Sequence, residues 1–221
     1  MKSIWMVVIT LTLMAGCAGQ GAKIDGSAGY LTQNQYDLLQ EYESASGATV
    51  YRYISPSFKA ANYNSAVVVP VVTHPEPQAT EQVSLATINT LQTKMTALVS
   101  DSLKAVLPLA TEPGQGVLKF DTAITGVDIS NTNLKVYQYI PVALVINSVK
   151  TVAGGRDQKV RLNIEMKVSD SLTGDVLVVA VRQIAGEDLE NVKTKLDANQ
   201  LNKGLATAGK DMVSSLKSVF K

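Results

Sequence analysis

The sequence predicts an α+β fold: a single domain with an antiparallel or mixed sheet of four to five strands and two main helices packed on it. Residues 84–106 and 201–219 each repeat apolar side chains at three- and four-residue steps, as amphipathic helices do. Residues 160–168 alternate apolar and polar side chains without interruption, which is typical of a half-buried strand. These elements fall within residues 30–221, a length that buries a substantial core, so we expect one domain there.

Residues 1–16 precede the predicted domain and have the pattern of a secretory signal peptide. Lys2 is followed by a short apolar run of about 10 residues, whereas a helix that spans a membrane needs about 20. Cys17, the only cysteine in the 221 residues, follows this segment directly. A single cysteine excludes an intrachain disulfide, a zinc cluster of cysteines and a redox dithiol.

Residues 13–17 (Leu-Met-Ala-Gly-Cys) resemble the lipobox of bacterial lipoproteins, with Met14 where that family most often has leucine. The resemblance implies that Cys17 receives a diacylglycerol on its sulfur, that the signal is cut before it, and that the new amine is acylated. Several acyl chains together form a stable membrane anchor. Ala18, rather than aspartate, follows the cysteine, which by resemblance to enterobacterial sorting implies the periplasmic face of the outer membrane. The alternative is a plain secretory signal followed by an unmodified cysteine.

The N-terminal part of the predicted mature chain divides into a tether and an arm. Residues 17–29 are rich in glycine and alanine, so we expect a flexible tether behind the lipidated cysteine. Residues 30–42 carry three tyrosines and three leucines in a polar setting, and they predict a short helical turn. This segment is either an arm packed on the domain or a segment that binds a partner.

The first strand and the first long helix have clear boundaries. Residues 65–73 are rich in valine and too short for a helix, so they predict a buried strand interrupted by Pro70. Ser84 is a suitable N-cap for the helix that follows, and the helical pattern ends before Pro108.

The remaining strands lie between the two long helices. Residues 118–125 alternate as a strand, and Gly126 marks a bulge where the apolar phase shifts. Residues 136–149 form another β-rich stretch. The turn residues 170–174 join the alternating strand described above to the apolar strand 176–181, so we expect an antiparallel hairpin.

The balanced charge and the absence of catalytic motifs argue against an enzyme, a metalloprotein or a nucleic-acid-binding protein. The chain has 20 basic and 19 acidic residues, and the signal removes one basic group, so the mature charge is balanced. The single histidine, His74, lies in a proline-rich loop where we expect it to be solvated. No catalytic, phosphate-binding or dinucleotide-binding motif occurs, so we expect no catalytic residues, no metal and no cofactor except the lipid on Cys17.

Acidic side chains are the candidates for a metal site or an active site, if the protein has one. Asp170 and Asp175 bracket a turn, and we expect them to stabilise it. The alternative is that they bind calcium, although their spacing matches no complete calcium loop. An enzyme would require two carboxyl groups together in a deep pocket, with a raised pKa. The candidates for such a pair are Asp121, Asp128, Glu165 and Asp170.

Two sets of side chains are candidates for binding a partner. Lys203, Lys210 and Lys217 lie opposite the apolar face of the last helix, where they form either an anion-binding surface or an ordinary solvated face. Tyr137 and Tyr139 are either stacking aromatics beside a ligand cleft or strand residues packed under a helix.

Several segments together resemble a family of bacterial lipoproteins called domain of unknown function 3313. These segments are the lipobox, Tyr-Leu-x-x-x-x-Tyr-x-Leu at 30–38, residues 63–70, Tyr-Ile-Pro-Val at 139–142, and Asp-Ser-Leu-Thr-Gly-Asp-Val-Leu at 170–177. The family has no established activity, so the resemblance gives no activity and no catalytic residues to carry over to this chain. The order of elements is also similar to that of lipoproteins that activate penicillin-binding proteins or take part in curli secretion, which is an analogy of fold alone.

These observations favour a non-enzymatic outer-membrane lipoprotein that faces the periplasm and binds another envelope protein as an accessory or assembly factor. The alternative is a lipoprotein that binds a small ligand or a peptidoglycan glycan. We expect contact with the membrane through the lipid anchor and none with nucleic acid, and the oligomeric state stays open.

Overall fold

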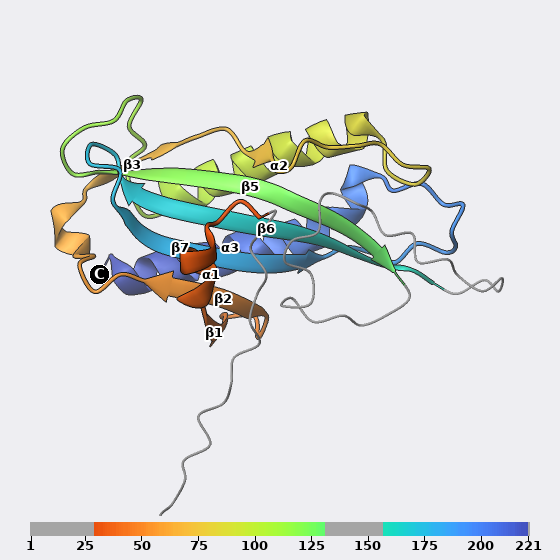
Figure 1. The fold of residues 1–221 in the computed structure, drawn as a ribbon, viewed down its shortest axis with the longest axis horizontal. Helices are drawn as coiled ribbons and strands as arrows, with labels where there is room; N and C mark the ends of the chain where they lie inside the picture. Colours follow the sequence, from red (N-terminus) through yellow and green to blue (C-terminus); the bar gives the residue numbers. More distant parts are fainter. Residues whose placement is uncertain (1–28, 131–156, 221) are drawn as a thin grey trace, which may run out of the picture.

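The structure is a computed structural model that describes residues 29–130 and 157–220 (Figure 1). Cys17, Tyr137, Tyr139 and the predicted β-rich stretch 136–149 lie outside the described residues. The elements are α1 (Gln33–Asp37), β1 (Gln40–Glu43), β2 (Thr49–Ile54), η1 (Ala60–Asn62), β3 (Ser65–Val68), β4 (Val72–Thr73), α2 (Leu85–Lys104), β5 (Val117–Ser130), β6 (Lys159–Asp170), β7 (Val176–Ala185), η3 (Ala198–Leu201) and α3 (Asn202–Val219).

The described strands form one mixed sheet of seven strands in the order β1-β2-β7-β6-β5-β3, with β4 also paired to β5. The α+β class is confirmed, but the expected count of four to five strands is wrong. Part of the excess is the hairpin β1–β2, where all four residues of β1 are exposed at the sheet edge and carry no apolar alternation. The predicted strand 65–73 also divides at Pro70 into β3 and β4, which both run parallel to β5.

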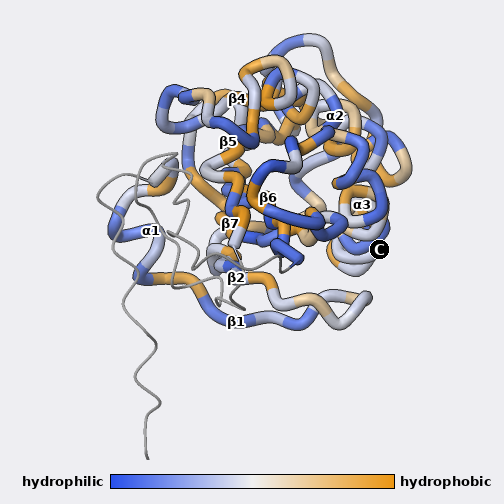
Figure 2. The backbone as a smooth tube through the Cα atoms, turned by 90° about the vertical axis from the view of Figure 1, so that its right-hand side faces the viewer, coloured by the Kyte–Doolittle hydropathy of each residue, from blue (hydrophilic) through white to orange (hydrophobic). Residues whose placement is uncertain are grey.

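Both long helices cover the same face of the sheet, with the short helix α1 on the other (Figure 2). The Ser84 side chain accepts a hydrogen bond from the Thr87 backbone N–H, which confirms it as the N-cap of α2. Apolar side chains of α2 and α3 pack on β5, β6 and β7 in two clusters. This helix face therefore holds most of the core.

The central strands follow the predicted pattern closely. The pairing of β5 with β6 shifts in register between Ile124 and Gly126, which confirms the bulge. β6 and β7 form the antiparallel hairpin. In its turn, the backbone N–H groups of Thr173 and Leu172 donate to Asp170 and hold the pKa of that carboxyl below its usual value. Asp170 therefore acts as a turn-stabilising acid.

The opposite face of the sheet is covered by residues 29–39, which we call the N-terminal arm. Leu31 and Tyr36 of the arm are buried against Val179 and Val181 of β7. The segment predicted as a packed arm or a partner-binding segment thus packs on the domain.

The arm is held by a buried carboxylate at its centre. Glu165 of β6 is 1% exposed and accepts hydrogen bonds from the backbone N–H groups of Tyr30 (3.0 Å) and Leu31 (3.1 Å) and from the Tyr36 hydroxyl (2.6 Å). Burial and the Glu165 carboxylate both raise the pKa of Tyr36, so its hydroxyl stays a donor. His74, expected to be solvated, is instead half-buried with its ring against Tyr30.

Candidate functional site

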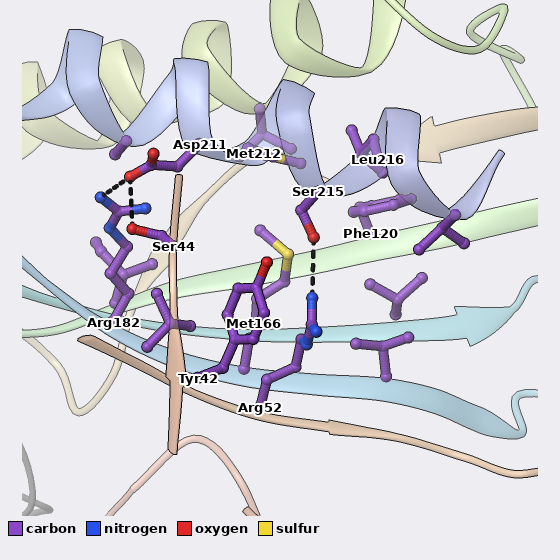
Figure 3. Close-up of a pocket in the computed structure, with 18 of the residues that line it drawn as sticks. Tyr42, Ser44, Arg52, Phe120, Met166, Arg182, Asp211, Met212, Ser215 and Leu216 are labelled. Atoms are coloured by element: carbon purple, nitrogen blue, oxygen red, sulfur yellow. Dashed lines mark hydrogen bonds and ion pairs between the residues drawn. The ribbon is translucent and has the colours of Figure 1, made fainter. Parts of the chain in front are cut away.

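A cavity of about 180 Å³ lies between α3 and the strands β1, β2, β6 and β7, and we call it the α3 cavity (Figure 3). Its position follows from the alternation of β7, because Val179 and Val181 pack against the arm and their neighbours point to the helix face. Two of those neighbours, Val178 and Ala180, are short and leave room under the helix. The wall of the cavity is mostly apolar, with Val50, Ile54, Phe120, Leu216 and Phe220 among its residues.

Methionine is concentrated in this wall. The chain has 6 methionines, and the three that follow the predicted signal, Met95, Met166 and Met212, all line the α3 cavity. Methionine is flexible and polarizable, and it is frequent at surfaces that adapt to different apolar ligands. The composition of the wall therefore favours an apolar ligand, to which the flexible methionine side chains can adapt.

One end of the cavity holds a neutralised ion pair. Asp211 of α3 accepts from Arg182 of β7 at 2.6 Å and from the hydroxyls of Ser44 and Ser46. Its side chain is only 4% exposed. Burial alone would raise the pKa of Asp211, but the hydrogen bonds from Ser46 and Arg182 outweigh burial and lower it. The carboxylate is therefore ionised at neutral pH and balances the Arg182 charge.

A second arginine lines the cavity with neutral partners. Arg52 of β2 donates from Nη1 to the Ser215 hydroxyl of α3 at 3.0 Å, and its guanidinium carbon lies 3.9 Å from the centre of the Tyr42 ring (Figure 3). Within the described part of the chain, none of the ion pairs includes Arg52. Glu41 and Glu43 of β1 alternate with Tyr42 and so point to the opposite face of the sheet.

The three predicted lysines do not belong to this cavity. Lys203, Lys210 and Lys217 are exposed on α3, as expected, and they are not among the residues that line the cavity. That they bind an anionic partner stays a prediction.

Each candidate carboxylate of an enzyme has a contact of its own. Asp121 pairs with Lys119, Asp128 with Arg161, and Glu165 binds the arm. The fourth, Asp170, stabilises its own turn. These four side chains are absent from the lining of the α3 cavity.

Sequence reasoning missed the cavity, although two signals were present. Asp211 falls on the apolar face of the last helix, between Leu205 and Met212, where a lone carboxylate needs a buried partner. Arg182 ends the apolar run of β7 and is that partner. Neither residue indicates free volume, because that depends on how α3 packs over the sheet.

Residues 29–130 and 157–220 contain neither a metal-binding cluster nor a membrane-spanning helix. No group of three or more histidine, cysteine, aspartate or glutamate side chains there has a metal-binding arrangement. No helix in these ranges is both long and apolar enough to cross a membrane.

Similar proteins are found by sequence and by structure. Two relatives, from Escherichia coli K12 and O157:H7, are each called "Uncharacterized lipoprotein YdcL"; both are 33% identical over 186 residues, covering 84% of this chain and 83% of theirs. A PelC dodecamer from Paraburkholderia phytofirmans aligns with a TM-score of 0.35 and 12% identity over 78% of this chain and 97% of that one. A homologue of a putative neuraminyllactose-binding hemagglutinin from Helicobacter pylori aligns with a TM-score of 0.35 and 12% identity, covering 76% and 93%.

The family assignment rests on the sequence matches. The model of the family described as "Protein of unknown function (DUF3313)" matches residues 28–212, which include the arm, the sheet and most of α3. Together with the two relatives, this match shows that the chain belongs to the DUF3313 family.

Proposed function

We propose that this protein is a non-enzymatic lipoprotein of the outer membrane that faces the periplasm and binds an apolar small ligand in the α3 cavity. The observation that carries the proposal is the cavity itself, with a volume of about 180 Å³ and a mostly apolar wall. An engineered apolar cavity of about 150 Å³ in another protein stays dry and binds benzene. The α3 cavity is comparable in size and is partly open to solvent, so a ligand can enter.

The anchor and the location are supported by the N-terminal sequence and by the relatives. Cys17 follows a lipobox-like segment, Ala18 follows Cys17, and both relatives carry the name lipoprotein. The proposal that the protein is not an enzyme is supported by the separate roles of the four candidate carboxylates. A binding function needs no reactive group, and the wall of the α3 cavity is mostly apolar.

Photolabelling tests the proposed ligand site. The lipoprotein in phosphatidylcholine nanodiscs is exposed to a diazirine analogue of a neutral fatty alcohol, and the labelled peptides are identified by mass spectrometry. We expect label on β7 and α3 at the cavity and its loss in Ala180→Phe, which fills the space. Ala105→Phe is the matched control, because Ala105 is exposed at the end of α2. Equal labelling of both variants and the wild type, or none, would contradict the proposal.

A second candidate function, an accessory or assembly factor that binds an envelope protein, has its own support. All four residues of β1 are exposed at the sheet edge, where the backbone has no further strand beside it in the described residues. Such an edge pairs with an extended segment of another protein. The exposed Lys203, Lys210 and Lys217 offer a different surface, for an anionic partner.

Crosslinking in intact cells separates these surfaces. A photoreactive amino acid is placed at Glu41 on β1 or at Lys210 on α3, and adducts are identified by mass spectrometry. An envelope protein captured from Glu41 and not from Lys210 would support edge pairing. Loss of capture when Lys203, Lys210 and Lys217 are changed to glutamine would instead support the lysine surface. No adduct from either position would count against an accessory role.

A further inference from the structure

We propose that the ligand of the α3 cavity is a fatty acid, with its acyl chain under α3 and its carboxylate on Arg52. This inference rests on the proposed ligand-binding function and adds the chemistry of the headgroup. It follows from the charges at the cavity, from the donors that Arg52 leaves unused, and from the shape of the apolar wall.

The charges at the cavity leave one positive group without a carboxylate. Arg182 is balanced by Asp211, whereas Arg52 has ion-pair partners nowhere in the described residues and contacts only the Ser215 hydroxyl and the Tyr42 ring. A half-buried cation beside an apolar cavity is best satisfied by an anion that enters with an apolar group. One free positive charge matches the single negative charge of a carboxylate.

The geometry of Arg52 also suits a carboxylate. A guanidinium has five N–H donors in a planar fork, and a planar carboxylate accepts from two of them at once. In the structure, one donor of Arg52 is used by Ser215, and the guanidinium carbon lies over the Tyr42 ring, 3.9 Å from its centre. The contact with the Tyr42 ring takes up none of the N–H donors as a hydrogen bond, so donors remain for a ligand.

The apolar wall favours a single chain that runs away from the ion pair. The α3 residues of the wall extend from Ala208 to Phe220, which is about 18 Å of helix at 1.5 Å per residue. The Asp211 carboxylate lies toward one end of this span and disfavours a second anion there. Beyond Ser215, the wall contains Leu216, Phe220 and Phe58. A chain whose headgroup sits at Arg52 therefore extends toward the phenylalanines.

The test compares two photoreactive probes that differ only in the headgroup. The full lipoprotein in phosphatidylcholine nanodiscs receives a diazirine fatty acid or the matching fatty alcohol, and label on residues 176–185 and 212–220 is normalised to label on the disc lipid. We expect the acid to label these residues at least about tenfold more than the alcohol, because hydrogen bonds to a charged group are the stronger kind.

Two variants that each remove one positive charge test whether Arg52 causes the preference for the acid. Arg52→Gln should reduce the preference for the acid to within about twofold, while labelling by the alcohol persists. Lys104→Gln removes a positive charge from the exposed end of α2, outside the cavity lining, and it should leave the preference unchanged.

Each other result has a definite meaning. Equal labelling by acid and alcohol, unchanged in Arg52→Gln, would overturn the headgroup assignment and leave the proposed ligand site intact. Absence of label from both probes would overturn the ligand site as well. Lysophosphatidylglycerol that displaces the acid probe more effectively than palmitate does would overturn the fatty acid in favour of a phospholipid.

Discussion

The two faces of the sheet are filled by different means. On the arm face, three donors converge on the buried carboxylate of Glu165, and the N-terminal arm lies over the strands in one fixed position. On the helix face, apolar contacts dominate, and the α3 cavity stays open between Ala180 and Met212. Directional hydrogen bonds specify a position, whereas apolar burial depends on area and has no preferred direction. The arm face therefore fixes structure, and the helix face has room for a ligand.

Glu165 should produce the largest effect on stability. Glu165→Ala leaves the Tyr36 hydroxyl and two backbone N–H groups without their acceptor, so we expect the free energy of unfolding to fall by about 3 kcal/mol. Urea denaturation measures the loss, and hydrogen exchange at Tyr30 and Leu31 shows whether the arm is released. Glu165→Gln keeps one acceptor oxygen and should lose less. A loss below about 1 kcal/mol in Glu165→Ala would mean that the arm is held mainly by apolar contact.

A pair of matched substitutions compares the packing of the two faces. Ala123 of β5 pairs with Glu165, so it shares the arm face, and it is 0% exposed. Ala123→Leu should cost about 1–3 kcal/mol, which is usual for an overpacked interior. Ala180→Leu adds the same atoms into the α3 cavity and should cost less than about 1 kcal/mol. Equal costs in urea denaturation would show that the cavity closes in solution.

The pH dependence of stability tests the ion pair at the end of the cavity. The pKa of Asp211 is lower in the folded protein than in the unfolded chain. Its contribution is therefore complete above the unfolded value of about 4 and is lost as the pH falls through the lower, folded value. Asp211→Asn should flatten this part of the profile of unfolding free energy against pH. Asp101→Asn, at an exposed carboxyl of α2, serves as the control and should not.

Arg52 should have the smallest effect on stability. It contacts a hydroxyl and an aromatic ring at a partly exposed site, and its charge is not paired in the described residues. We expect Arg52→Gln to change the free energy of unfolding by less than about 1 kcal/mol. A larger loss in urea denaturation would indicate that Arg52 holds α3 to β2, which is a structural role.

The amphipathic helices and strands were predictable from the sequence. Which segment covers each face of the sheet was not. Apolar side chains recur every three to four residues in α2 and α3 and at every second residue in β6. Each pattern arises because a single segment packs one of its faces on the core, so it can be read from that segment alone. Glu165 occupies a polar position in that alternation, so sequence alone places it on a solvated face. The arm that buries Glu165 precedes it by 129 to 135 residues, and no local pattern links the two.

The hairpin β1–β2 and the cavity were missed for related reasons. β1 lies at the sheet edge with all four residues exposed, so burial imposes no alternation on its sequence. Arg52 and Ser215 meet only because β2 pairs with β7 and α3 packs over both. The volume between them depends on tertiary packing, which a single sequence does not encode in any short pattern.

The methionine methyl groups offer the most direct test of the α3 cavity as a ligand site. Met95, Met166 and Met212 all line the cavity, so the lipoprotein with ¹³C-methyl methionine reports on the cavity from three sides. In nanodiscs titrated with palmitate, we predict saturable changes at all three methyl signals in the wild type and none in Ala180→Phe. Methyl signals that do not change in the wild type, or that change equally in Ala180→Phe, would contradict the account.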